Sequence, residues 1–105
     1  MRVRDRGDRI GVPGEFAKPA RARDDVHFRF TLFPRQELMN AADVLRILRL
    51  LEGSAIAVWL DGGWGVDALL GIQSRPHNDV DLVLQISDVP RLRAAMAGVG
   101  FTLQR

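Results

Sequence analysis

The pattern of hydrophobic and polar positions along the chain changes at residue 39. Residues 1–38 show no sustained helical period, and one brief alternation of apolar and polar residues indicates a short strand at 26–32. Three of the five prolines lie in this region, at Pro13, Pro19 and Pro34. We interpret residues 1–38 as an irregular or disordered N-terminal extension and residues 39–105 as the N-terminal part of a folded domain. Because the composition changes at Met39, we expect that translation could begin there.

The folded region, 39–105, begins with clear helix signals. Asn40 is a capping residue, Asp43 supplies negative charge to the first turn, and apolar residues recur at helical spacing until Gly53. The rest of the pattern predicts, in chain order, a buried strand at 55–60, a turn at 62–65, a short helix at 66–70, a loop at 72–78, a strand at 79–86, a helix from 87 or 88, and a strand from 101. This order predicts an α/β or α+β fold with helices packed on a sheet.

Composition excludes several classes of protein. The 105 residues suffice for one small domain, and 47% hydrophobic and 27% charged residues are typical of a globular protein. The absence of cysteine excludes a disulfide scaffold and a thiolate metal site, and it is compatible with the cytoplasm, where we expect the protein to act. No apolar run approaches the ~20 residues of a membrane-spanning helix.

The net charge of +2 does not indicate nucleic-acid binding. Residues 1–38 carry nine basic against six acidic residues, whereas residues 39–105 carry six against seven. A nucleic-acid interface needs basic residues clustered on one face, and here they are scattered among glycine, proline and acids. We therefore expect neither a nucleic-acid partner nor a membrane partner.

Two aspartates separated by one residue form the first candidate site. Asp79 and Asp81 lie on the strand predicted at 79–86, so both side chains leave the same face, with Cα atoms about 6.5–7 Å apart. Such carboxylates could share one Mg²⁺ or flank two metal ions, and the lack of cysteine favours a hard, oxygen-ligated cation over zinc. For an isolated pair, two solvated aspartates at a strand edge are the favoured interpretation over a metal site.

A glycine turn upstream forms the second candidate site. Gly62 and Gly63 follow a predicted strand and precede a short helix, so backbone N–H groups at a positive helix end could hold phosphate. The spacing matches neither the dinucleotide-binding nor the P-loop pattern, and such glycines are also common for steric reasons. Together with the aspartate pair, the turn indicates nucleotide and magnesium chemistry.

Two residues in the loop at 72–78 could assist at this site. The guanidinium of Arg75 matches phosphate oxygens and could stabilise charge on a triphosphate, but a solvated loop arginine is an equal alternative. His77 could orient a substrate or bond near the metal, and a structural role in the loop is the alternative.

Four more side chains near the turn receive provisional roles. Trp64 is expected to pack under the turn rather than stack on a base, and Trp59 is expected in the core. Asp67 is expected on the surface of the short helix. The role of Asp61 stays open.

Two stretches carry a family resemblance. The segments 59–71, with the core Asp-Gly-Gly-Trp-Gly-Val-Asp, and 75–82, with Arg-Pro-His-Asn-Asp-Val-Asp-Leu, resemble the small antibiotic nucleotidyltransferases. These form the aminoglycoside 2″-adenylyltransferase and lincosamide nucleotidyltransferase group of the polymerase-β-like superfamily. The likeness extends from about Asn40 to Arg105 and is most specific across 59–82.

The resemblance implies a mixed β-sheet flanked by helices, here incomplete. It also implies Mg²⁺-dependent transfer of a nucleoside monophosphate from an NTP, expected to be ATP, to a hydroxyl of a small molecule such as an aminoglycoside or lincosamide. Carried over to this sequence, Asp79 and Asp81 are the catalytic, Mg²⁺-binding residues. Gly62 and Gly63 hold the β- and γ-phosphates, and Arg75 is a further candidate for binding the nucleotide.

The sequence departs from the family pattern at two places. Gly62-Gly63 stands where the superfamily usually has glycine-serine, which removes a hydroxyl contact to phosphate. Family members also use a third carboxylate on a later strand, commonly as the base for the acceptor hydroxyl, and we expect the chain to stop at about the start of that strand. A missing strand would leave an open sheet edge, through which the chain could form a homodimer.

Three functions therefore stay open. The first is a nucleotidyltransferase that acts on a small-molecule acceptor. The second is a truncated, non-catalytic fragment of that fold which binds a nucleotide or a partner. The third is a minimal nucleotidyltransferase of a toxin–antitoxin-like pair, which the aromatic Gly-Gly-Trp-Gly turn favours less than the drug-modifying group.

Overall fold

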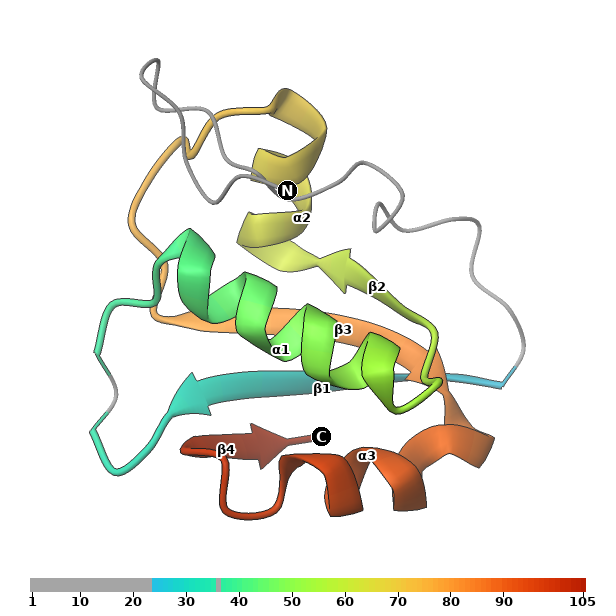
Figure 1. Ribbon diagram of the computed structural model, residues 1–105. Coiled ribbons are helices and arrows are strands. Elements are labelled where there is room, and N and C mark those ends of the chain that lie inside the picture. Colours follow the sequence, from blue (N-terminus) through green and yellow to red (C-terminus); the bar gives the residue numbers. More distant parts are fainter. Residues whose placement is uncertain (1–23, 36) are drawn as a thin grey trace.

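A computed structural model describes residues 24–35 and 37–105. Its elements, in chain order, are β1 (Asp25–Leu32), α1 (Ala41–Gly53), β2 (Val58–Asp61), α2 (Gly62–Leu70), β3 (Asp79–Gln85), the 3-10 turn η2 (Ile86–Asp88), α3 (Val89–Met96) and β4 (Phe101–Gln104). The four strands form one sheet in the order β2-β3-β1-β4 (Figure 1). The predicted α+β class is confirmed, and every strand pair in the described residues is antiparallel rather than mixed.

Helix α1 begins as the sequence predicts. The Asn40 side chain accepts a hydrogen bond from the Asp43 backbone N–H at 2.9 Å, and the Asp43 carboxylate accepts one from the Asn40 N–H at 3.0 Å. This reciprocal capping box satisfies two donors that the helix itself leaves unpaired. Gly53 is the last helical residue, and Ser54 is the C-cap, one residue later than the expected boundary.

Helix α2 differs from its prediction at its first turn. The glycines expected to form a separate turn at 62–65 are the first turn of the helix, which runs directly on from β2. Gly62 takes the positive φ of +61° that permits this abrupt change of direction, and Gly71 ends the helix in the left-handed conformation. No residue therefore separates the end of β2 from the start of α2, whereas the sequence predicted a separate turn at 62–65.

Strand β1 lies inside the sheet, between β3 and β4 (Figure 1). It covers the segment where the alternation indicated a short strand, so part of the N-terminal region pairs with the domain along the full length of β3. The irregular structure expected for the rest of that region falls on residues 1–23, outside the described residues. A domain division at 38/39 stays a prediction.

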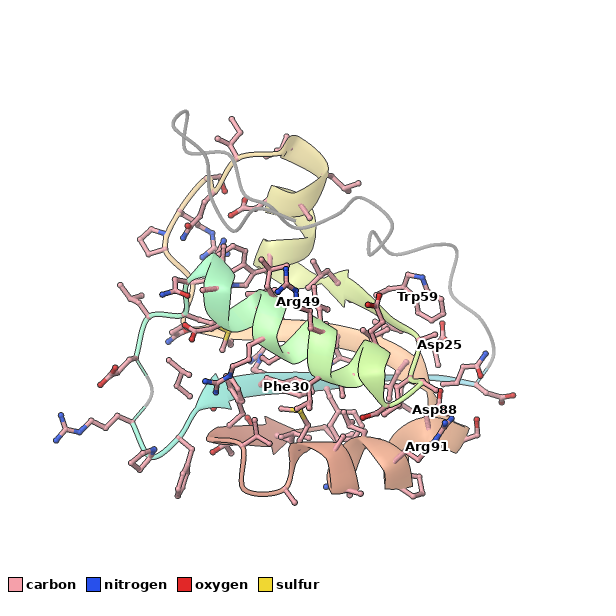
Figure 2. All side chains as sticks on the ribbon, viewed as in Figure 1. Asp25, Phe30, Arg49, Trp59, Asp88 and Arg91 are labelled. Atoms are coloured by element: carbon pink, nitrogen blue, oxygen red, sulfur yellow. The ribbon has the colours of Figure 1, made fainter. Side chains whose placement is uncertain are left out.

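The two faces of the sheet have different side chains. Alternate residues of all four strands pack with α1, α2 and α3 into one apolar core, which includes Phe28, Leu60, Leu82 and Leu84. Phe30, labelled in Figure 2, lies on this face beneath α1. The opposite face carries the polar residues of β1 and β3, so the sheet separates the core from the aspartate pair. None of the helices in the described part of the chain has the length and apolar composition needed to cross a membrane.

Trp59 is not in the core, in contrast to its prediction. It is half-buried on β2 and pairs in register with Val83 of β3. Both have odd numbers in strands whose even-numbered residues face the helices, so Trp59 lies on the polar face of the sheet.

Candidate functional site

Asp79 and Asp81 lie at the beginning of β3, on the polar face of the sheet. Asp81 is 7% exposed, whereas Asp79 is half-buried. In the strand register Asp81 lies between Asp61 of β2 and Arg29 of β1. The alternation of the strand therefore places both carboxylates on one face, as the spacing predicted.

Strand β1 supplies positive charge to this pair. Arg29 Nε donates to Asp81 Oδ1 at 3.0 Å and lies 3.5 Å from Asp79 Oδ2, and His27 Nε2 lies 2.9 Å from the same Asp81 oxygen. The hydrogen bond to Asp81, together with the negative charges of Asp81 and Asp79, raises the pKa of Arg29 above its ordinary value. Two acidic groups in one strand are thus balanced by a neighbouring strand.

The two carboxylates supply oxygen donors, the ligand type that hard divalent cations take. The two carboxylates converge on a single positive group, the Arg29 guanidinium, which occupies the position where a cation would be attracted. No group of three or more acidic, histidine or cysteine side chains suited to a metal occurs in the described ranges. Magnesium in nucleotide sites commonly takes only one or two carboxylates and completes its octahedron with phosphate oxygens and water.

The glycine turn lies directly against the aspartate pair. A Cβ at residue 62 would collide with Asp81 Oδ2, so only glycine allows the helix to begin this close to the carboxylate. Asp61, at the N-cap of α2, makes no side-chain capping bond to the helix. The first-turn N–H groups of a helix have no intrahelical acceptors, and they carry the positive end of its dipole.

A hollow of about 450 Å³ opens beside the turn. Its lining residues come from the end of β2, the first turns of α2 and the following loop: Asp61, Gly62, Gly63, Val66, Asp67, Ser74 and Arg75. The Arg75 Nη2 atom lies 3.2 Å from the position that a Cβ of residue 63 would take. The fold thus brings Arg75 to the glycine turn, and the volume is within the range of small-ligand pockets.

Asp67 is fully buried, so its expected surface position is wrong. Its carboxylate accepts from Ser74 Oγ at 2.5 Å and from His77 Nε2 at 2.6 Å, and His77 is only 5% exposed. Burial alone would raise the pKa of Asp67, but the hydrogen bonds from Ser74 and His77 outweigh burial and lower the pKa below 3.8. The group is therefore an ionised, fully bonded carboxylate beneath the hollow.

Asp67→Asn is expected to destabilise the fold by about 2–4 kcal/mol at neutral pH, because one buried donor loses its charged acceptor. The folded-state pKa of Asp67 is lowered, so its contribution is complete above the unfolded pKa near 3.8 and disappears as the pH falls through the folded pKa. Urea unfolding from pH 7 to pH 3 measures this. The difference in the free energy of unfolding between wild type and variant should be constant above about pH 5 and should become smaller only below about pH 4. A difference that already becomes smaller near pH 6 would contradict this prediction.

Two features of the site were missed in the sequence. Asp67 lies three residues after Trp64, on the same helix face, and Ala68 lies four residues after Trp64; the apolar residues on this face were a signal that Asp67 is buried. The contacts of His27 and Arg29 with Asp81 gave no such signal, because residues 54 and 52 positions apart are brought together only by the strand register.

The sequence was compared with known proteins. The chain is 34% identical over 62 residues to a lincosamide resistance protein of Staphylococcus haemolyticus, which covers 59% of this chain and 38% of that protein. It is 40% identical over 37 residues to a 2″-aminoglycoside nucleotidyltransferase of Escherichia coli, which covers 35% of this chain and 21% of that protein, and equally to one of Klebsiella pneumoniae.

The chain thus spans well under half the length of these curated relatives. No solved structure matches it significantly. The sequence model of the family described as aminoglycoside-2″-adenylyltransferase matches residues 43–105, from the first turn of α1 to the end of the chain. Because this match covers more than half of the chain, the protein belongs to the aminoglycoside-2″-adenylyltransferase family.

Proposed function

We propose that this chain carries the nucleotide- and metal-binding part of an antibiotic nucleotidyltransferase. The reaction would transfer a nucleoside monophosphate from an NTP, with ATP as the first candidate, to a hydroxyl of an aminoglycoside or lincosamide. Family membership and the functions for which the relatives are named support this class. The observation that carries the proposal is the contact between Gly62 and Asp81, which joins a phosphate cradle to a carboxylate pair.

Each part of the site has a role in the proposed reaction. The acceptor hydroxyl gives up its proton to water as its oxygen forms a bond to the α-phosphorus, the bond from that phosphorus to the bridging oxygen breaks, and pyrophosphate leaves. The amides of Gly62 and Gly63 and the Arg75 guanidinium would hold the triphosphate in the hollow. Asp79 and Asp81 would hold Mg²⁺, which supplies neutralisation of phosphate charge when bound. Positioning and charge then account for most of the rate enhancement.

A second candidate is a non-catalytic fragment that binds a nucleotide or a partner. Two observations favour it: Arg29 already forms an ion pair with Asp81, and within the described residues no group of three or more acidic, histidine or cysteine side chains is arranged to hold a metal ion. The catalytic candidate and a nucleotide-binding fragment require the same nucleotide site, so turnover separates those two.

The test is an incubation of the purified chain with Mg²⁺, ATP or GTP, and an aminoglycoside or a lincosamide. Catalysis predicts pyrophosphate release and a drug whose mass has increased by one nucleotidyl group, both lost in Asp79→Asn/Asp81→Asn. Nucleotide binding without a modified drug would leave the non-catalytic candidate. Neither binding nor product would reject both.

Arg29→Gln is expected to bind Mg²⁺ about three- to tenfold more tightly than the wild type, because it removes a positive group that competes for both carboxylates. The matched control is Arg91→Gln, which breaks the ion pair between Arg91 of α3 and Asp88 of η2 (Figure 2). Calorimetric titration with Mg²⁺ should show a change for Arg29→Gln alone. Equal affinities in all three proteins would mean that Arg29 does not compete with the cation.

A further inference from the structure

The buried pair of Asp67 and His77 has no role in the reaction as proposed so far. Asp67 belongs to α2, and His77 lies in the loop that precedes β3. An ionised carboxylate only accepts hydrogen bonds, so His77 Nε2 carries the hydrogen in their 2.6 Å contact. The side chains of Asp67 and His77 are only 1% and 3% exposed. Burying a charged carboxylate costs free energy, which its hydrogen bonds must offset, so the pair holds both side chains in defined positions.

The Nδ1–Cε1 edge of the His77 ring lies against Gly63. A Cβ at residue 63 would come within 2.5 Å of the ring Cε1 and 2.6 Å of Nδ1, so the ring fills the space where a side chain would otherwise be. Trp64 packs on the same ring with centroids 5.0 Å apart and planes at 54°. The backbone of His77 is also fixed, since its carbonyl accepts from the Met39 N–H at 2.7 Å. The ring is therefore held by Asp67, Trp64 and the chain on either side of it.

The His77 ring contacts two residues that line the hollow, Gly63 and Asp67, but does not line it itself. Gly63, Asp67 and Ser74 line the hollow, whereas His77 does not. A displacement of the ring would therefore change the position of the Gly63 backbone without removing any group that itself touches a ligand in the hollow. This geometry separates a positioning role from direct binding.

We propose that the Asp67–His77 pair is a positioning pair that holds the Gly63 backbone in the geometry that binds the triphosphate. The inference rests on the proposed nucleotide site and adds two residues to it. It also explains why residue 63 is glycine where a serine would be usual for the superfamily: the His77 ring leaves no room for a Cβ.

The test compares three variants of the full chain with the wild type. His77→Gln keeps a donor that can reach Asp67 but removes the ring from Gly63. Asp67→Asn keeps the size of the side chain but removes the charge that orients the ring, and it serves as the second variant if His77→Gln does not fold. Met96→Ala is the stability control, because it weakens the core at α3, which packs against α1.

The first readout needs no nucleotide. Hydrogen exchange of the Gly65, Val66 and Asp67 amides, whose helical acceptors are the carbonyls of residues 61–63, should accelerate about tenfold or more in His77→Gln and Asp67→Asn relative to the rest of α2. In Met96→Ala these amides should change no more than their neighbours. Unchanged local exchange in both site variants would overturn the positioning role, whatever the protein binds.

The second readout is affinity for Mg²⁺–ATP. The dissociation constant should rise about tenfold or more in both site variants and stay within twofold in Met96→Ala. If the wild type binds ATP and the site variants bind it equally well, the inference fails while the proposed function stands. If the wild type does not bind any nucleotide, the proposed function fails, and with it the role of the pair.

Discussion

Replacing Asp79 and Asp81 together by asparagine is expected to weaken Mg²⁺-dependent nucleotide binding at least ~100-fold. Each carboxylate would contribute a charge-assisted interaction of about 1.5–3 kcal/mol, and each 1.4 kcal/mol corresponds to a factor of ten. Asparagine keeps the size and shape of both side chains, so β3 retains its place between β1 and β2. Calorimetric titration with ATP, with and without Mg²⁺, measures the effect.

The control for this double substitution is Glu52→Gln, which removes one exposed acid near the end of α1. It should bind like the wild type. The double variant also leaves Arg29 and His27 without their charged partner, so thermal unfolding of the same samples must show that the protein is folded. ATP affinity that does not depend on Mg²⁺ and survives the substitution would eliminate the aspartate pair as a metal site.

Gly62→Ala is expected to have the second large effect. An alanine at φ +61° costs about 1–2 kcal/mol, and its Cβ would collide with Asp81 Oδ2. Relief of that collision must move the helix start or the carboxylate, for a total of about 2–4 kcal/mol of lost stability. Nucleotide affinity should fall with it, because the turn and the aspartate are displaced relative to each other. Urea unfolding and ATP titration measure the two effects.

Helix α2 provides a matched control at its other end. Gly71 has φ +75°, but a Cβ there would have no atom within 4 Å. Gly71→Ala should therefore lose only the conformational part, about 1 kcal/mol, and keep its nucleotide affinity. If both alanine variants lost the same stability and neither lost affinity, the contact between Gly62 and Asp81 would have no role in the site.

Local signals predicted much of this fold. The Asn40–Asp43 capping box, the alternation along β3 and the αL glycine at residue 71 each depend on residues close in sequence, and each is present in the structure. The boundaries of β2 and α2 were less accurate. An apolar strand and a glycine-rich helix start carry no capping side chain that would mark where one ends and the other begins.

The features that could not be predicted depend on long-range pairing. Whether Asp81 faces Arg29 or another residue is decided by the register of β1 on β3, and a shift by one residue would turn Arg29 to the apolar face. Burial of Asp67 likewise depends on how the loop at 72–78 folds back over α2. The one-residue spacing of Asp79 and Asp81 predicted that both carboxylates lie on one face of the strand. Only the folded chain shows that Arg29 lies beside them and balances their charge.

We propose that Gly62, Gly63, Asp79 and Asp81 form one site for a nucleotide and a divalent cation. The most direct measurement is a titration of the isotope-labelled protein with Mn²⁺ and ATP, followed by NMR, because the paramagnetic ion broadens signals of nearby nuclei. The amide signals of residues 62–63 and 79–81 should disappear first and return when excess Mg²⁺ displaces Mn²⁺. Broadening centred elsewhere on the chain, or none at these residues, would contradict the claim.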